Sequence, residues 1–335
     1  MTTLTRQKLA DLFRSFLEYE SVVDQPTSLA AYECDGLSAY RQTPLLVVLP
    51  RTIEEVQKIV LICAEKNVPI VSRGAGTSLS GGALPHAEGI VLSLSKMAQI
   101  LNIDVNAQSI TVQPGLRNLA VSEAVKHLGL YYAPDPSSQI ACSIGGNVAE
   151  NAGGVHCLKY GLTLHNVLGV TLVMATGELL VLDQQSLQSQ GYDLLALVIG
   201  SEGMLGIVVE VTLKLLPIPQ CAQALLAVFD DVEKAGNSVA SIISGGIIPA
   251  GVEMMDNPAI RAAEAFVHAG YPVDAAAILI CELDGTEAEV ESQISKVDSI
   301  LKSSGAVETR LAKDDAERLL FWSGRKAAFP AVGRL

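Results

Sequence analysis

A glycine- and hydroxyl-rich stretch at residues 73–82, RGAGTSLSGG, constrains this chain more than any other feature. It follows the apolar run at residues 68–71, which predicts a short buried strand. Glycines let the backbone adopt positive φ and approach a ligand closely, so successive N–H groups can converge on an anion, helped by the hydroxyls of Thr77, Ser78 and Ser80. The stretch therefore predicts a phosphate-binding loop, and a purely structural glycine-rich turn is the alternative.

Two common phosphate-binding motifs do not fit this loop. The Walker A pattern lacks its Lys and its Ser/Thr, because Gly82 and Ala83 occupy those places. The Rossmann fingerprint starts at Gly74, but Leu79 stands where its third glycine belongs, and no acidic residue follows at residues 93–96. We therefore expect neither a P-loop NTPase nor a Rossmann domain.

Two further glycine groups follow. Residues 134–154 have small side chains at nearly every position, which would leave a flat wall for a planar ring, with the amides of Asn147 and Asn151 at its edge. A closely packed small-residue helix and turn is the alternative. The third group, at residues 200–206, leads into an apolar strand. One extended ligand that touches these groups is the simpler interpretation.

Length and charge narrow the class of protein. A chain of 335 residues exceeds the usual size of one core and predicts two domains. With 23 basic and 36 acidic residues the net charge is −13, which opposes nucleic-acid binding and requires a local cation for any anionic substrate. The six cysteines have no C-x-x-C spacing, so we expect no metal or iron–sulfur cluster within this chain.

The local patterns predict an α+β protein. An amphipathic helix and an arm occupy residues 1–40, a proline-bounded strand follows at residues 44–50, and Thr52 with Glu55 predicts a capping box before a helix. Beyond Pro219, candidate strands at residues 223–229, 250–255 and 275–282 alternate with candidate helices at residues 231–243, 257–268 and 286–303. This alternation predicts an antiparallel sheet with helices on one face.

Taken together, these groups resemble the FAD-linked oxidases whose flavin domain is named after p-cresol methylhydroxylase and vanillyl-alcohol oxidase. The resemblance is carried by residues 50–56, 73–82, 144–154, 159–161 and 200–207. It implies a two-subdomain FAD-binding domain at residues 41–219, followed by a ferredoxin-like α+β cap domain at residues 220–335. The cap is expected to be incomplete at its C-terminus.

The resemblance implies a noncovalent FAD, because residues 74–82 contain no His for a covalent link and His86 lies after the loop. Backbone groups of the first loop would bind the pyrophosphate, the second group would line the flavin and its ribityl chain, and the third would approach the other side of the dinucleotide. The residues so assigned are Arg73, Gly74, Ala75, Gly76, Thr77, Ser78, Ser80, Gly81, Gly82, Pro134, Ser138, Gly145, Gly146, Asn147, Asn151, Gly153, Glu202, Gly203 and Ile207. His156 and His165 could also touch the cofactor, although a packing role is the commoner one for such residues.

Within this family, the chain is most similar to the branch that contains the flavin subunits of glycolate oxidases together with D-lactate dehydrogenases. Residues 319–326 resemble the segment of the cap in which a Trp precedes a substrate-facing Arg, which makes Arg325 the expected carboxylate binder and Lys326 a weaker second candidate. The implied reaction is oxidation of a small 2-hydroxy acid, glycolate or D-lactate, to the 2-oxo acid. No His, Asp or Glu follows Arg325, so the usual proton acceptor is missing and we expect a truncated chain.

The resemblance also implies partner subunits, among them an iron–sulfur protein that would accept the electrons. A non-catalytic flavin-binding subunit is the alternative function, and an NADPH-dependent flavin reductase fits less well because it leaves residues 322–326 unexplained. No signal peptide and no apolar run of about 18 residues is present, so we expect a cytoplasmic location with at most peripheral association with the inner face of the membrane.

Overall fold

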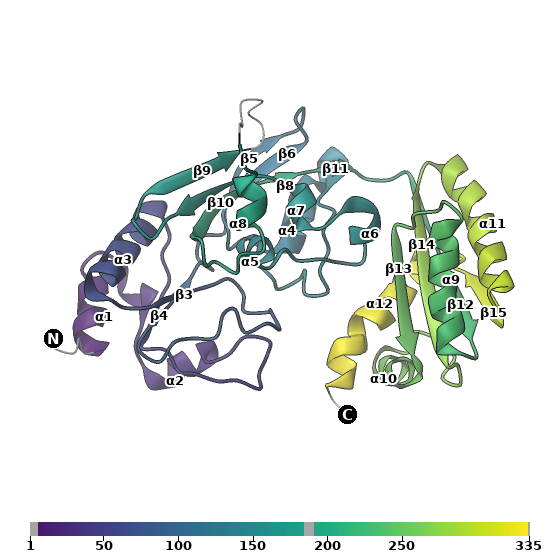
Figure 1. Cartoon of the computed structure of the whole chain (residues 1–335), viewed down its shortest axis with the longest axis horizontal. Coiled ribbons are helices and arrows are strands. Elements are labelled where there is room, and N and C mark those ends of the chain that lie inside the picture. The colour runs from purple at the N-terminus through teal and green to yellow at the C-terminus, as the bar shows by residue number, and fades with distance from the viewer. Residues whose placement is uncertain (1–5, 184–190, 334–335) are drawn as a thin grey trace. The chain divides into compact units, whose positions relative to one another are not determined.

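The structure, a computed structural model, describes residues 6–183 and 191–333 (Figure 1). It forms two compact units, of which the first contains Met1–Gly153 and Leu162–Pro217 and the second contains Gly154–Gly161 and Ile218–Leu335. The short segment Gly154–Gly161 thus groups with the second unit, although it lies inside residues 41–219, the range that the sequence predicts for the FAD-binding domain.

The first unit begins with a small sheet and its covering helices: α1 (Arg6–Arg14), β1 (Val22–Val23), α2 (Pro26–Leu29), β2 (Leu46–Val48), α3 (Ile53–Lys66), β3 (Ile70–Arg73) and β4 (Ile90–Ser93). The strand order is β1-β2-β4-β3, with β2, β4 and β3 parallel and β1 antiparallel to β2. Apolar residues of α1 and α3 pack in one core with this sheet. Strand β3 ends at the start of the predicted phosphate loop.

Helix α3 begins as the sequence predicts, with one difference at its cap. The Thr52 hydroxyl accepts a hydrogen bond from the Glu55 N–H at 3.3 Å. The Glu55 carboxylate, however, accepts from the N–H of Arg51 at 2.6 Å, one residue earlier than the reciprocal bond of a capping box. The helix ends at Asn67, whose φ of 55° reverses the chain into β3.

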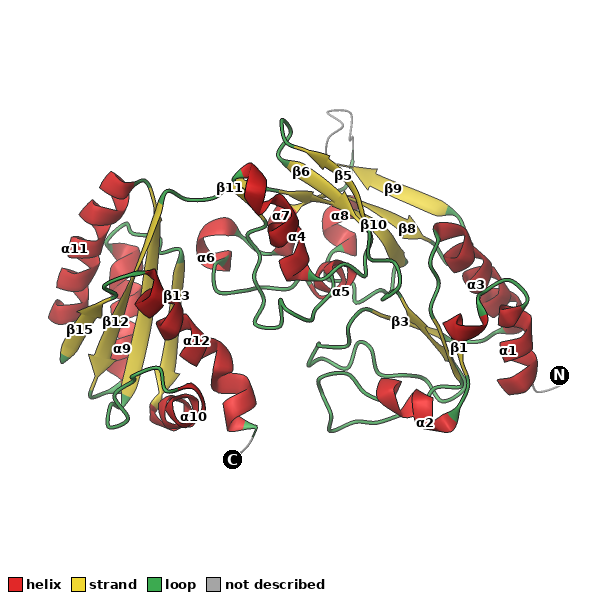
Figure 2. Cartoon of the chain, turned by 180° about the vertical axis from the view of Figure 1, so that it is seen from behind, coloured by secondary structure: helices red, strands yellow, loops and turns green. Residues whose placement is uncertain are grey.

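The second sheet of this unit is antiparallel, in the order β5-β6-β10-β8-β9. Its face of alternating apolar residues packs in a single core with the surrounding helices, which gather at one face of the sheet in Figure 2. The elements are β5 (Ile100–Asp104), β6 (Ser109–Val112), α4 (Asn118–Val125), β7 (Leu130–Tyr131), α5 (Ile144–Glu150), α7 (Thr163–Asn166), β8 (Val167–Val173), β9 (Leu179–Asp183), α8 (Leu194–Val198), β10 (Ile207–Lys214) and β11 (Leu216–Pro217).

The second unit has the predicted ferredoxin-like topology. Its elements are α6 (Cys157–Tyr160), β12 (Cys221–Phe229), α9 (Val232–Ser244), β13 (Gly251–Asp256), α10 (Asn257–Val267), β14 (Ala277–Gly285), α11 (Glu287–Ser303), β15 (Glu308–Leu311) and α12 (Asp315–Val332). The strand order is β13-β14-β12-β15 with every pair antiparallel, and the crossover helices α9 and α11 pack in one core on one face.

The expectation of helices on one face only is wrong. Helices α10 and α12 contribute to a second core on the opposite face of the same sheet (Figure 1). The reason lies in β12 and β14, which are apolar and buried on both faces over most of their length, so each face requires its own cover.

Candidate functional site

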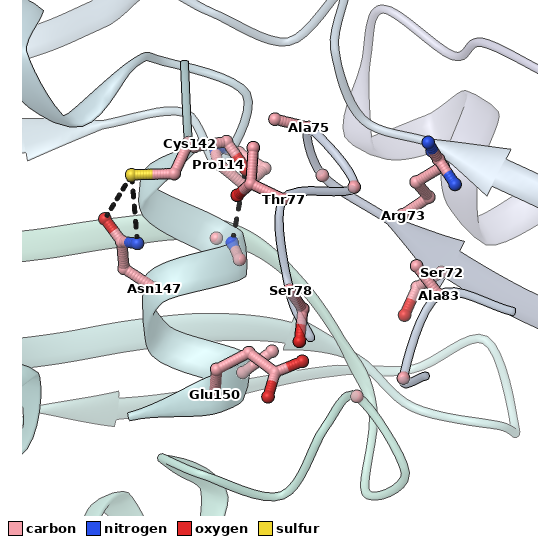
Figure 3. Close-up of a pocket in the computed structure, with 18 of the residues that line it drawn as sticks. Ser72, Arg73, Ala75, Thr77, Ser78, Ala83, Pro114, Cys142, Asn147 and Glu150 are labelled. Carbon is pink, nitrogen blue, oxygen red and sulfur yellow. Dashed lines mark hydrogen bonds between the residues drawn. The ribbon is translucent and has the colours of Figure 1, made fainter. Parts of the chain in front are cut away.

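A pocket of the first unit forms where the loop after β3 passes helix α5 (Figure 3). The backbone N–H groups of residues 74–78 donate no hydrogen bond to any residue that the structure describes. These five N–H groups belong to consecutive residues that all line the pocket. A run of free backbone donors in a concave site is the arrangement that binds phosphate oxygens.

Two glycines keep this loop open. The φ of Gly76 is 70°, a conformation that residues with a side chain rarely adopt. At Gly74 an added Cβ would overlap the hydroxyl oxygen of Ser143, the residue that caps α5. The absence of side chains therefore allows the loop to lie directly against the start of this helix.

Helix α5 forms the second wall, but its own N-terminus is not a phosphate site. The N–H groups of Ile144 and Gly145 donate to the carbonyls of Leu116 and Pro114, each at 2.8 Å, and Gly146 donates to the Ser143 hydroxyl at 3.3 Å. These three donors are satisfied within the protein, whereas the N–H groups of residues 74–78 in the first loop are not. Gly145 and Gly146 line the pocket, and a Cβ on Gly145 would lie only 2.5 Å from the Pro114 Cβ, so this glycine lets α5 pack closely against Pro114.

The amide of Asn147 is held by its neighbours. Its oxygen accepts from the Asn118 amide at 3.0 Å, and its nitrogen donates to the Cys142 sulfur at 3.3 Å (Figure 3). Burial raises the pKa of the Cys142 thiol, so this sulfur stays protonated near neutral pH. The Asn147 side chain thus fixes the wall, and it is less free to bond a ring edge than the sequence suggests.

Two carboxylates meet at the third wall. An added Cβ on Gly82 would lie 3.0 Å from Glu150 Oε1 and 3.1 Å from Glu202 Oε2, so both groups approach one point on the loop. The Ser80 hydroxyl donates to Glu150 Oε2 at 3.0 Å. Carboxylates accept hydrogen bonds and repel phosphates, so this corner suits hydroxyl groups of a sugar or polyol.

Arg73 is the single cation among the described residues that line the pocket, and it is engaged elsewhere. Its guanidinium donates to the Cys34 carbonyl at 2.7 Å and lies 5.6 Å from the centre of the Tyr32 ring. Burial lowers the pKa of this guanidinium, while Cys34, Tyr32 and Asp35 oppose that shift. Figure 3 shows the side chain extending away from Asn147, so Arg73 ties the N-terminal arm to the loop.

The second unit holds the predicted cation of the substrate site, Arg325 on α12. Its Nη2 and Nε atoms lie 2.8 and 3.1 Å from the same oxygen of Glu253, on strand β13. Its Nη1 has no hydrogen-bond partner among the residues that the structure describes. Lys326, the weaker candidate, likewise has no partner within this part of the chain.

Helix α12 carries two more polar side chains that hold it to the sheet. Arg318 Nη1 and the indole nitrogen of Trp322 donate to Glu282 Oε2 at 3.0 and 2.6 Å, and His156 Nε2 lies 3.2 Å from Oε1. Burial alone would raise the pKa of the Glu282 carboxyl, but His156, Arg318 and Trp322 together lower it below its ordinary value. Glu282 is therefore a buried carboxylate with donors on both oxygens.

Comparison with known proteins identifies both parts of the chain. Residues 44–183 match the model of the FAD binding domain, and residues 218–335 match the model of the C-terminal domain of FAD linked oxidases. The chain belongs to the FAD-linked oxidases.

Relatives with known names support this membership of the FAD-linked oxidase family. Glycolate oxidase subunit GlcD of Escherichia coli K12 is 62% identical over 91% of this chain and 61% of that protein. Glycolate oxidase subunit GlcD of Bacillus subtilis is 39% identical over 94% and 67%, and a D-lactate dehydrogenase of Anaerostipes hadrus is 33% identical over 89% and 64%. The chain spans about three fifths of the length of the E. coli relative.

Solved structures show the same fold at low identity. p-Cresol methylhydroxylase superposes with a TM-score of 0.79 at 19% identity, covering 95% of this chain and 68% of that one. Alkyldihydroxyacetonephosphate synthase gives a TM-score of 0.78 at 20% identity, covering 95% and 63%. The α+β fold predicted from the sequence is confirmed, including its relation to the p-cresol methylhydroxylase type.

The pocket contains most of the residues that the FAD-linked oxidase resemblance predicts for the cofactor. Those that line it are Arg73, Gly74, Ala75, Gly76, Thr77, Ser78, Gly82, Ser138, Gly145, Gly146, Asn147, Glu202 and Gly203. Ile207 lines an adjoining apolar pocket that shares Ser72, Gly203 and Gly206 with the first. Ser80, Gly81, Pro134, Asn151 and Gly153 do not line the main pocket.

Hydrogen bonds within the protein explain why three of these residues do not line the main pocket. The Pro134 carbonyl accepts from the Asn118 amide at 3.0 Å. Asn151 ends helix α5 with a φ of 49°, and its side-chain oxygen accepts from the Leu164 N–H at 3.0 Å. Ser80 instead bonds Glu150. The polar groups of these three residues are therefore engaged within the protein.

The sequence patterns do not predict several of the lining residues. Pro114 and Leu94 come from loops without a motif, whereas Glu150 and Ser143 lie inside the second glycine group, where the glycines and the asparagine amides are the predicted contacts. His156 and His165 do not line the pocket, since His156 bonds Glu282 and His165 accepts from the Leu162 N–H at 3.0 Å. Within the described ranges, no helix has the length and apolar character needed to cross a membrane.

Proposed function

We propose that this protein is the flavin-bearing part of an enzyme that oxidises a small 2-hydroxy acid, glycolate or D-lactate, to the 2-oxo acid. The observation that carries the proposal is the run of free N–H groups at residues 74–78, in a chain 62% identical to a glycolate oxidase subunit. Such a run suits an anionic ligand, and the pyrophosphate of FAD provides one in a family that binds FAD.

The residues present fit a noncovalent FAD. The free N–H groups of residues 74–78 would bind the pyrophosphate, the side of the pocket at Gly145 and Gly146 would accept the flavin, and Glu150 and Glu202 would accept hydrogen bonds from sugar or ribityl hydroxyls. The apolar pocket at Ile207 would accept a second planar ring. When bound, FAD supplies an acceptor for the hydride that leaves the hydroxyl-bearing carbon.

The second unit would supply the substrate's counter-charge. Arg325 would bind the carboxylate, because a guanidinium offers two parallel N–H donors to the two oxygens of that group. In a chain with a net charge of −13, such a local cation offsets the repulsion of an anionic acid. Lys326 would add a second positive charge to the same region of α12.

Anaerobic titration of the FAD-loaded protein tests this proposal. Glycolate or D-lactate should bleach the flavin absorbance at about 450 nm, as expected when flavin accepts the hydride, and L-lactate serves as the stereochemical control. Retained FAD without bleaching by either acid would instead support a non-catalytic flavin-binding subunit. Bleaching by NADPH alone would support a flavin reductase.

We also propose that the protein works beside other subunits, one of them an iron–sulfur protein that takes the electrons. The name of the E. coli relative, a subunit of glycolate oxidase, supports an assembly of this kind. Affinity purification of the tagged protein from its own cells should recover a partner with iron and acid-labile sulfide. Recovery of the flavoprotein alone would contradict this part of the proposal.

A further inference from the structure

Helix α12 presents three polar side chains along one side, Arg318, Trp322 and Arg325, at spacings of four and three residues. The first two donate to Glu282 on β14, and the third donates to Glu253 on β13. Since both carboxylates lie on strands of one sheet, they fix how far the helix is rotated about its axis. The direction in which Arg325 extends is therefore set by the sheet.

The contact between Arg325 and Glu253 uses only one edge of the guanidinium. Nε and Nη2, which form the side edge, both point at Glu253 Oε2, at 3.1 and 2.8 Å. The end edge, formed by Nη1 and the second hydrogen of Nη2, has no acceptor among the residues that the structure describes. A planar guanidinium can bind one carboxylate on each edge at the same time.

We propose that Glu253 is a positioning residue, which holds the side edge of Arg325 so that the end edge binds the carboxylate of the 2-hydroxy acid. This inference rests on the proposed function. The side chain of Arg325 is about one third exposed, at 31%, so its free edge can be reached by a small acid. The Glu253 side chain is less exposed, at 26%, and leaves strand β13 on the side of α12.

If Glu253 opposed substrate binding, its removal would change the affinity for the carboxylate in the opposite direction. If Glu253 merely neutralised Arg325 or competed with the substrate, then its removal would strengthen carboxylate binding. If it orients the guanidinium, its removal lets a long flexible side chain leave the productive geometry, and binding weakens. The sign of the change in affinity therefore decides between the two roles.

The test uses the FAD-loaded protein and two readouts. Calorimetry gives the Kd of glyoxylate, the 2-oxo acid product, which requires no turnover, and anaerobic stopped-flow gives the half-saturating glycolate concentration and the limiting rate of flavin reduction. For Glu253→Ala we expect both concentrations to rise by about tenfold, with the limiting rate within about twofold of the wild type. Glu291→Ala, on α11 at the other face of the sheet, is the control and should change neither.

Two conservative variants separate geometry from charge. Glu253→Gln keeps an oxygen in the same place and should bind glyoxylate within about threefold of the wild type, whereas Glu253→Asp keeps the charge but withdraws the oxygen and should bind several-fold more weakly. Should Glu253→Ala fail to fold, Glu253→Asp takes its place. Wild-type or tighter glyoxylate binding by Glu253→Ala, or by Glu253→Asp in its place, would overturn the inference.

A double-mutant cycle links the effect to Arg325. Arg325→Ala should abolish most glyoxylate binding, and adding Glu253→Ala to it should cause no further loss, because the side chain to be positioned is gone. Additive losses would show that Glu253 acts elsewhere and would overturn the inference. If the wild type neither binds glyoxylate nor is bleached by a 2-hydroxy acid, the proposed function itself is wrong; if it is bleached and Glu253→Ala leaves binding unchanged, only the positioning role is wrong.

Discussion

At the scale of single residues, Gly74 lies where the loop after β3 passes closest to helix α5. An added Cβ there would overlap the Ser143 hydroxyl, and the Gly146 nitrogen would lie 3.5 Å away. Any side chain at this position requires either the loop or the Ser143 hydroxyl, which caps α5, to shift. A shift of the loop would displace the free N–H groups of residues 74–78.

We predict that Gly74→Ala weakens FAD binding. Overpacking of this kind costs about 1–3 kcal/mol, and the same cost in the bound state raises the Kd by about fivefold to 150-fold. Quenching of flavin fluorescence on titration measures the Kd. Gly236→Ala on α9 is the control, since a Cβ there meets no atom within 4 Å, and it should leave FAD binding unchanged. Equal affinity of Gly74→Ala and the wild type would contradict the prediction.

The sequence predicted the phosphate-binding loop better than it predicted the hydrogen-bond partners of each side chain. Glycine spacing indicates such a loop because its cause is local: the backbone of Gly76 can adopt positive φ, and glycine has no Cβ. The roles of Asn147 and Arg73 depend instead on Asn118 and Cys34, which lie 29 and 39 residues away along the chain. Such contacts exist only after folding, so no local pattern contains them.

At the scale of elements, helix α12 is attached to β14 through the buried Glu282. This carboxylate is 3% exposed and accepts from Arg318 and Trp322 of α12 and from His156 of the segment Gly154–Gly161. Its pKa lies below the ordinary value of 4.5, because the hydrogen bonds and charges of these partners outweigh the effect of burial. A group with a lowered pKa in the folded protein stabilises the fold above the unfolded pKa and loses that contribution as the pH falls.

We predict that Glu282→Gln destabilises the protein by about 3 kcal/mol at pH 7, the order of cost for leaving buried charged partners without their counter-ion. Wild-type stability should fall as the pH drops from 4.5 through the lower folded pKa, and the variant should lose this part of the slope. Urea unfolding at a series of pH values measures both. Glu291→Gln, exposed on α11, should stay within about 0.5 kcal/mol of the wild type. An unchanged slope in Glu282→Gln would exclude the carboxylate as its source.

Elements were predictable where caps and periodicity agree. Helix α11, predicted at residues 286–303, begins with a capping box of Thr286 and Glu289 with bonds of 3.4 and 3.0 Å, and α10, predicted at residues 257–268, is capped by Asp256, which accepts from Ala259 at 3.1 Å. Helix α12 was not predicted, because Gly324 and Pro330 within it are helix-breaking signals. Gly324 is needed there for a tertiary reason, since a Cβ would collide with the Tyr271 ring.

At the scale of the whole molecule, the chain passes between the two units three times, after residues 153, 161 and 217. The segment Gly154–Gly161 is bound in the second unit through Asp284, which pairs with the Lys159 ammonium and accepts from the Tyr160 hydroxyl at 2.7 Å. Both ends of this segment continue directly into the first unit. Unfolding of the second unit would therefore release the residues that follow helix α5.

This connectivity predicts that FAD, although its proposed site lies in the first unit, stabilises the second unit as well. Trp322 is the sole tryptophan and is buried in the second unit, so its fluorescence reports unfolding there. FAD at a hundred times its Kd contributes about 2.7 kcal/mol to the fold that binds it. We expect FAD to raise the thermal midpoint seen by Trp322 fluorescence together with that seen by far-ultraviolet circular dichroism.

Asp284→Asn should weaken this coupling, because it removes the charge that holds Lys159 while leaving the FAD pocket untouched. In this variant FAD should still bind with wild-type affinity, but the rise in the Trp322 midpoint should be smaller than in the wild type. Asp298→Asn on α11, which removes a carboxylate paired with Lys302, is the matched control and should keep the full rise. If FAD leaves the Trp322 midpoint of the wild type unchanged, the two units unfold independently and the segment Gly154–Gly161 does not couple them.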